Sequence, residues 1–325
     1  MPNLSKYLWY FKKLKRGVSA NLTKAPHKPI MLLAIINGIR KGHITNNKVF
    51  ITPELLLNFR ETWKQLVDTG HTENFALPFF HLRSEPFWDL IAKPGMEIGI
   101  TRSGSIRSFK NLRETVAFAV IDAELFLLLQ QSETCQVLEE QLLQYYFYDT
   151  RSNYWNDLNS AEESLLEYQI QNESGKEYRE RLLSLKSQLD DSSYQEEIFI
   201  RGGLFKRSIP RIYDYKCSIS GMRIMGPPNI QMIDACHIHP FSLSNDDTVS
   251  NGIALSPTLH RAFDRGLISI TEDYKVKVSS LVNDKDSKFT LTQFDGKDLL
   301  LPSKKSWFPS VQSIKWHQEN IFINE

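Results

Sequence analysis

Apolar side chains near the start of the chain follow helical spacing. Leu4, Leu8, Phe11 and Leu14 recur every three or four residues, which predicts a helix with one buried face. The run from Pro29 to Ile39 is apolar on all sides, and a proline in the first turn is typical of a helix start. This second run therefore predicts a helix buried in the core.

Further along the chain, capping residues mark the start of two longer helices. Thr52 is suited to an N-cap, Pro53 to the first helical position, and Leu55–Val67 continues with an amphipathic pattern. Leu125–Phe147 also has a long helical pattern, which is interrupted near Ser132. Together with short apolar strand signals, these patterns predict an α+β protein with a mostly helical N-terminal part.

The chain changes character after residue 150. Residues 151–200 hold eleven Asp and Glu against five Lys and Arg, with polar breaks, and predict an acidic linker with one helix over Lys176–Leu189. A length of 325 residues is enough for two domains. We therefore expect an N-terminal domain over residues 1–150, this linker, and a C-terminal domain over residues 201–325.

Composition places the chain among ordinary globular proteins. Apolar residues make up 41% and charged residues 24% of the sequence, and the net charge is +1. No apolar run approaches the roughly 20 residues of a membrane span, and lysines interrupt the N-terminal apolar stretch, so neither a membrane segment nor a signal peptide is expected. A cytoplasmic location is the expectation.

Cysteine usage excludes a disulfide scaffold. The three cysteines, Cys135, Cys217 and Cys236, are an odd and sparse set, and no two of them form a Cys-x-x-Cys pair. We therefore predict no structural zinc.

Positive charge is concentrated at the N-terminus. Residues 1–53 contain ten Lys and Arg and no Asp or Glu, and the aromatic residues Tyr7, Trp9, Tyr10 and Phe11 lie among them. Basic side chains interleaved with aromatic ones are typical of a DNA-contacting surface. The alternative is a solvated helix whose aromatic side is core, and both can hold on one helix.

Candidate chemistry is concentrated between residues 213 and 270. His237 follows an apolar stretch, and a neutral imidazole can accept a proton from water near pH 7. His260 and Asp264 are four residues apart, so they share a helix face and suit two ligands of one divalent cation. Asp234 lies three residues before His237, on the opposite face of an extended strand. The plainer interpretations are a turn-capping acid for Asp264 and a surface acid for Asp234.

The phrases YDYKCSISG, IDACHIHPFS and NGIALSPTLHRAFDRGLISI resemble the HNH endonuclease family, which has a ββα-metal fold. The resemblance implies that His237, Asn251 and His260 are the catalytic positions, with His237 as general base and one divalent cation, Mg²⁺ or Mn²⁺. The family often has a metal ligand just before the first His, where this chain has Cys236. Because a thiolate suits Mg²⁺ poorly, Asp234 is the preferred third ligand. Asn251 is expected to orient the loop that carries His237.

The N-terminal part has a second resemblance. KAPHKPIMLLAIINGI, LPFFHLRSEPFW and DAELFLLLQQSETCQVLEEQLLQYYF are similar to the sulfur-binding domain of modification-dependent restriction enzymes. The resemblance implies a type IV-like endonuclease that reads phosphorothioate-modified double-stranded DNA. A sulfur atom calls for an apolar hollow with cations near the phosphate. The resemblance implies that a proline ring contacts the sulfur, here Pro78 beside Leu77, and that His27 and Lys28 lie beside the modified phosphate. His81, Arg83 and Arg102 are further candidates for contact with a phosphate or a base edge.

Two other functions remain open. A modified-base reader would stack an extruded base, for which Phe79, Phe80, Phe87 and Trp88 are candidates. A catalytically inactive DNA-binding protein is the second, although the intact His237 and its partners argue against it. Because a double-strand cut needs two active sites, a homodimer is also an expectation.

Overall fold

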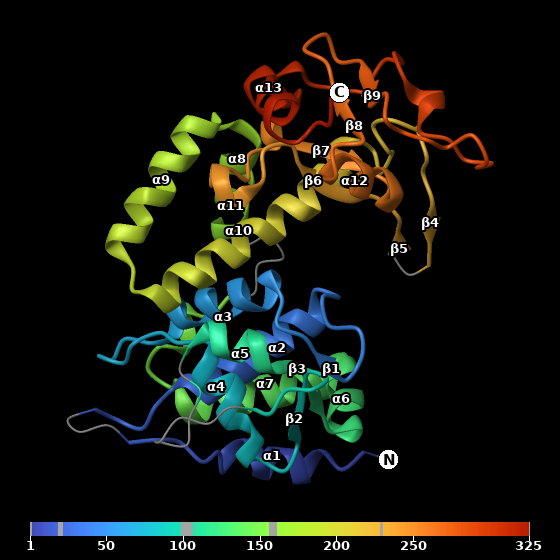
Figure 1. Ribbon diagram of the computed structural model, residues 1–325. Helices are drawn as coiled ribbons and strands as arrows, with labels where there is room; N and C mark the ends of the chain where they lie inside the picture. Colours follow the sequence, from blue (N-terminus) through green and yellow to red (C-terminus); the bar gives the residue numbers. More distant parts are fainter. Residues whose placement is uncertain are drawn as a thin grey trace. The chain divides into compact units, whose positions relative to one another are not determined.

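The computed structural model describes residues 2–18, 22–98, 106, 108–155, 161–227 and 230–324. The chain divides into two compact units, coloured along the sequence in Figure 1. The N-terminal unit comprises Met1–Ser164 and Leu189–Ile200, and the C-terminal unit comprises Leu165–Gln188 and Arg201–Glu325. None of the helices in the described ranges has the length and apolar character needed to cross a membrane.

The N-terminal unit is built mainly from helices around a buried central one. Its α-helices are α1 (Leu4–Lys12), α2 (His27–Arg40), α3 (Pro53–Leu66), α4 (Ala76–His81), α5 (Phe109–Thr115), α6 (Ala123–Gln130) and α7 (Ser132–Tyr146), with 3-10 turns η1 (Leu82–Ser84) and η2 (Arg151–Asn153). Helix α2 is buried over most of its length and packs against α3, α4, α6 and α7. The uniformly apolar run predicted as a core helix is thus the centre of this unit.

Local sequence signals explain where these helices begin and end. The Thr52 hydroxyl accepts a hydrogen bond from the Leu55 amide at 3.2 Å, and Pro53 occupies the first helical position of α3, as predicted. The long helical stretch breaks at Gln131, whose extended backbone separates α6 from α7. The predicted interruption near Ser132 is therefore confirmed to within one residue.

One small antiparallel sheet completes the N-terminal unit. Its strands are β1 (Lys48–Val49), β2 (Trp88–Ala92) and β3 (Val116–Ile121), in the order β1-β3-β2. The β2–β3 register shifts between Ile91 and Ala92, where a bulge ends the regular pairing. The sheet and the helices together confirm the α+β class and the mostly helical N-terminal part.

The C-terminal unit combines long helices with short two-stranded sheets. Its elements include α9 (Gly175–Gln188), β4 (Met225–Gly226), β5 (Ile230–Gln231), β6 (Asp234–His237), α11 (Phe241–Ser244), η3 (Val249–Asn251), β7 (Gly252–Leu255), α12 (Pro257–Asp264), β8 (Ile268–Ile270), β9 (Val276–Val278), η4 (Thr292–Phe294), η5 (Lys305–Trp307) and α13 (Val311–Asn320). Antiparallel β6 and β7 followed by α12 form a ββα arrangement.

Residues 151–200, which the sequence predicts to be a linker with one helix, contain more helical structure than expected. They include α8 (Ala161–Asn172), α9 and the first part of α10 (Asp191–Ile212). These helices have exposed acidic faces but bury a few apolar residues each, such as Ile170, Tyr178 and Leu182. A narrow apolar stripe within an acidic segment is a weak signal in the sequence, although it is sufficient for packing once a neighbouring surface covers it.

Candidate functional site

Strand β6 divides the candidate chemistry into two sides. Side chains alternate along a strand, so Asp234 and Cys236 face helix α12 while His237 faces the other way. Helix α12 begins after Ser256, with Pro257 at its first position. Cys236 and His237 are adjacent in the chain, so the α12-facing side chains and His237 start from neighbouring backbone positions of β6.

The side facing α12 holds a cluster of possible metal ligands. The imidazole of His260 lies between two carboxylates: its Nδ1 is 3.2 Å from Asp234 Oδ2, and its Nε2 is 3.4 Å from Asp264 Oδ2. The Cys236 thiol donates to Asp264 Oδ1 at 3.8 Å. Ligand atoms of Cys236, His260 and Asp264 all lie within 4.8 Å of one another, close enough to share one cation.

Asp234, the third metal ligand that the sequence predicts, lies outside this compact group. In the described residues Cys236 completes the group, and Asp234 contacts the other imidazole nitrogen of His260. The reason is geometric, because both residues face α12 and Cys236 lies next to Asp264. Burial, reinforced by the charge of Asp264, raises the pKa of the Cys236 thiol well above its usual value. Carboxylate and imidazole donors in this cluster suit a hard or borderline divalent cation.

On the other side of β6, His237 is held by a carboxylate and an aromatic ring. Its Nε2 lies 2.8 Å from Oδ1 of Asp247, which is 1% exposed, and its ring stacks on Phe205 with centroids 3.9 Å apart and planes at 9°. An Nε2–H that donates to Asp247 leaves Nδ1 as the proton acceptor. The side chain of His237 is 21% exposed, so water can reach it.

Asn251 is a structural link between the two strands of the ββα arrangement. Its buried side-chain amide donates to the carbonyls of His239 and Asp246, both at 2.9 Å, and its Oδ1 accepts from the His239 amide at 3.0 Å. These bonds hold the segment that follows His237. These contacts are consistent with the predicted loop-orienting role of Asn251, because its side-chain amide is hydrogen-bonded to backbone groups.

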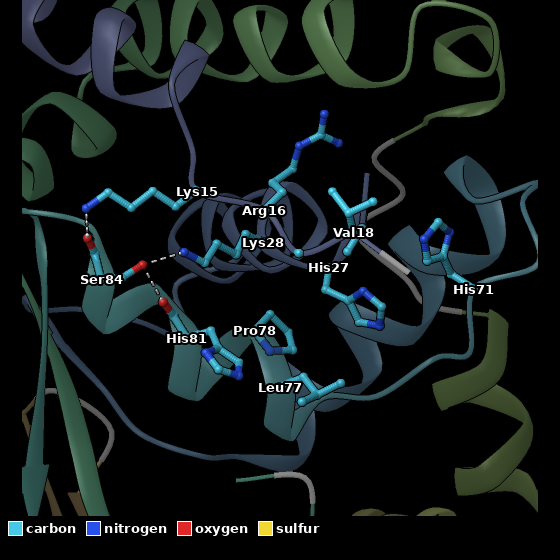
Figure 2. A pocket seen from close by; sticks show the side chains of 12 residues that line it. Lys15, Arg16, Val18, His27, Lys28, His71, Leu77, Pro78, His81 and Ser84 are labelled. Carbon is cyan, nitrogen blue, oxygen red and sulfur yellow. Dashed lines mark hydrogen bonds between the residues drawn. The ribbon is translucent and has the colours of Figure 1, made fainter. Parts of the chain in front are cut away.

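A separate pocket lies in the N-terminal unit, and Figure 2 shows its lining. It has a volume of about 330 Å³ and contains Leu77 and Pro78 of α4 beside His27 and Lys28 of α2. The other lining residues are Lys15, Arg16, Gly17, Val18, Ala25, His71, His81 and Ser84. The structure thus brings together five of the seven DNA-binding candidates, namely His27, Lys28, Leu77, Pro78 and His81.

The charges at this pocket differ from those expected. The Lys28 ammonium is buried, 2.5 Å from Glu85 Oε1 and 2.8 Å from Ser84 Oγ, and burial lowers its pKa. His27 Nε2 lies 2.9 Å from the Thr72 carbonyl, and burial also lowers the pKa of this imidazole. His27 is therefore neutral at pH 7, and the charge of Lys28 is balanced by Glu85. The positive charge that the sequence predicts beside the phosphate at these two positions is therefore reduced.

Two cations that sequence reasoning did not single out lie at the pocket instead. Lys15 is exposed and donates to the Ser84 carbonyl at 3.2 Å. Arg16 is half-buried, with its guanidinium carbon 4.5 Å from the Tyr146 ring centroid. Both belong to the basic stretch of residues 1–53, which was the available signal. Their place beside Leu77 and Pro78 depends on the tertiary fold.

The remaining DNA-binding candidates have different positions. Arg83 is exposed and lies outside the pocket lining, with its guanidinium carbon 3.9 Å from the centroid of the Phe80 ring. Arg102 falls outside the residues that the structure describes. The aromatic residues considered for stacking an extruded base are all 0–1% exposed, namely Phe79, Phe80, Phe87 and Trp88. They form core, so they offer no accessible platform for a base.

Comparison with known proteins supports the nuclease resemblance. Residues 217–271 match the HNH endonuclease family, and no curated protein matches the chain significantly. The chain is similar to the solved structure of the modification-dependent TagI restriction endonuclease, with 20% identity and a TM-score of 0.27 over 36% of this chain and 37% of TagI. It is also similar to the type IV phosphorothioation-dependent restriction endonuclease ScoMcrA, with 10% identity and a TM-score of 0.33 over 78% of this chain and 93% of that one. The family match places an HNH endonuclease domain within the C-terminal unit, at residues 217–271.

Proposed function

We propose that this protein is a modification-dependent DNA endonuclease of the type IV-like restriction class. Its N-terminal unit reads phosphorothioate-modified double-stranded DNA, and its HNH domain cleaves DNA by metal-assisted phosphodiester hydrolysis. The observation that carries this proposal is the ββα arrangement, in which β6 presents His237 on one side and the cluster of Cys236, His260 and Asp264 on the other.

In this proposal, His237 is the general base. Its Nε2 is engaged by Asp247, so Nδ1 takes the proton from the attacking water. A base in position contributes about 10²–10⁴-fold to the rate of such a reaction. Asp247 keeps the imidazole in the required tautomer and stabilises the positive charge that forms on the ring.

The residues on the α12 side of β6, opposite His237, are suited to hold one Mg²⁺ or Mn²⁺ ion. His260 and Asp264 are the proposed ligands, and Asp234 orients the imidazole from its other nitrogen. A divalent cation bound there would stabilise the negative charge that develops on the phosphate and the leaving oxygen. Cys236 lies within the same group, and its thiol is a poorer donor to Mg²⁺ than the carboxylate and imidazole beside it.

Sulfur selectivity is proposed to reside in the apolar wall of the N-terminal pocket. Leu77 and Pro78 present carbon atoms, and a sulfur atom costs less to remove from water than an oxygen carrying the same charge. Lys15 and Arg16 supply positive charge, which attracts modified and unmodified phosphates alike. The wall therefore discriminates, and the two cations add affinity.

Cleavage of matched duplexes tests this function. Two duplexes that differ in one sulfur atom are incubated with the full chain in Mg²⁺, Mn²⁺ or EDTA, with His237→Ala as the inactive control. We expect metal-dependent cleavage of the sulfur-containing duplex and weak cleavage of the other. Cleavage of neither duplex with any metal would refute the nuclease proposal. Equal cleavage of both duplexes would refute the sulfur proposal and leave the nuclease proposal standing.

Mutations in the pocket separate discrimination from affinity. Pro78→Gly or Leu77→Asn should remove the preference for sulfur while retaining weak binding to both duplexes. Lys15→Ala should weaken binding to both duplexes. It should also reduce the slope of log affinity against log salt concentration by about one unit, the value for one phosphate contact. Fluorescence anisotropy over a salt series measures both quantities, and sedimentation at the same concentrations tests for the proposed homodimer.

A further inference from the structure

We propose that helices α8, α9 and α10, which precede the residues matched by the HNH family, form part of the nuclease centre. Phe205, Tyr178 and Arg201 act as positioning residues for His237, partly through Asp247. This inference rests on the proposed function of His237 as general base. It extends the centre beyond residues 217–271 to side chains that start near residue 169.

The first line of support is the surface under the imidazole. Phe205 of α10 is fully buried, and its ring lies parallel to that of His237 at 3.9 Å. A planar platform of this kind restricts rotation of the imidazole about its side-chain bonds. The ring of His237 is therefore fixed by α10 on one face and by Asp247 at its Nε2 edge.

The second line of support is a buried polar chain that leads to Asp247. The Tyr178 hydroxyl of α9 lies 3.5 Å from Asp247 Oδ2, the carboxylate oxygen that His237 does not use. Burial raises the pKa of Tyr178 well above its usual value, so the hydroxyl keeps its proton and donates. The Arg201 guanidinium carbon lies 5.5 Å from the Tyr178 ring centroid, and its Nη1 donates to Gln169 Oε1 of α8 at 3.0 Å.

Burial makes this chain costly to disturb. Gln169, Arg201, Tyr178 and Asp247 are between 0% and 8% exposed. A buried polar group that loses its hydrogen-bond partner keeps its full desolvation cost. Each of these side chains is therefore held in one orientation by its neighbours. Together they fix the position of the Asp247 carboxylate.

The third line of support is the close approach of the helices to the HNH core. A Cβ on Gly252, which follows Asn251, would collide with the Ile209 side chain and lie 2.8 Å from Phe205 Cε2 of α10. A Cβ on Gly175, at the start of α9, would collide with the Asp246 carboxylate, next to Asp247. A side chain at either position would have to displace these neighbours, so α9 and α10 are packed directly against the loop and strand that flank His237.

The test compares three variants of the full chain with a matched control. Tyr178→Phe removes only the hydroxyl, Phe205→Leu removes the flat platform, and Asp247→Asn removes the charge. Tyr168→Phe, at an exposed position of α8, is the control for the loss of a hydroxyl. Single-turnover cleavage, DNA affinity and thermal stability are measured for each variant. The ¹⁵N chemical shifts of the imidazole ring report the tautomer of His237.

We expect cleavage rates at saturating DNA to fall about 10-fold for Tyr178→Phe and Phe205→Leu and about 100-fold for Asp247→Asn, with DNA affinity unchanged within about 2-fold. The NMR spectrum should show one Nε2–H tautomer in the wild type and a mixture in Asp247→Asn. Unchanged rates and an unchanged tautomer in folded Tyr178→Phe and Phe205→Leu would overturn the inference. A wild type that cleaves nothing would refute the proposed function, and the tautomer measurement would still decide the positioning role.

Discussion

A buried histidine at the back of helix α12 predicts a specific loss of stability in acid. His317 of α13 is 2% exposed, its Nδ1 lies 2.9 Å from Ser269 Oγ, and its Nε2 lies 3.2 Å from the Phe263 carbonyl. Its ring also stacks on Phe263, with the centroids 3.7 Å apart. The Phe263 carbonyl can only accept, so Nε2–H donates to it, and in the neutral ring Nδ1 accepts from the Ser269 hydroxyl.

The sign and size of the effect follow from its pKa. Burial lowers the pKa of His317 from 6.5 to about 4. Between these values the unfolded chain carries a proton here that the folded chain lacks, so stability is fully present above pH 6.5 and falls as the pH drops toward 4. The interval corresponds to at most about 3 kcal/mol, a large part of the stability of a domain.

Urea unfolding between pH 4 and pH 7.5 measures this effect. We expect the wild type to lose about 2–3 kcal/mol more than His317→Gln over this range, even though the variant is less stable at neutral pH. His43→Gln, at an exposed position, is the control and should follow the wild-type curve. Parallel pH curves for the wild type and His317→Gln would refute the reasoning, because the folded protein would then accept a proton at this position.

Three further outcomes are expected from single substitutions. His237→Ala should lower the cleavage rate about 10²–10⁴-fold and leave modified-DNA affinity within a few-fold, and near-wild-type cutting would remove His237 from the role of base. In a Mn²⁺ titration of activity, His260→Ala should be more severe than Asp264→Ala, and a wild-type curve for Asp264→Ala would make this residue a structural acid. Lys28→Ala should destabilise the N-terminal unit by about 3–5 kcal/mol because it leaves the buried Glu85 carboxylate without its cation. Thermal unfolding measures this change, and an unchanged melting temperature would show that Glu85 is readily hydrated.

Much of the secondary structure follows from local sequence. The start of α3 is specified by Thr52 and Pro53, and the apolar run after Pro29 can be satisfied only inside a core. The acidic helices α8 and α9 were less apparent, because their buried stripe consists of few residues. A weak stripe becomes a stable helix only when another element covers it, which depends on the whole fold.

The candidate site divides in the same way. His237, His260 and Asp264 could be found from sequence because their spacing lies within one ββα segment and carries its own chemistry. Phe205 and Tyr178 could not, since they are an ordinary core phenylalanine and tyrosine until the fold places them against His237 and Asp247.

The sequence by itself determined the class of fold, the positions of the strongest helices, the HNH segment and the basic character of the N-terminus. These features depend on residues close together in the chain, where spacing alone indicates geometry. The tertiary structure decided which charges remain available. Lys28 and Glu85 are 57 residues apart, and only the packing of α2 against the α4 region joins them into a buried pair. Burial and long-range pairing set protonation and charge, so the electrostatics of a site depend on neighbours that are distant in the sequence.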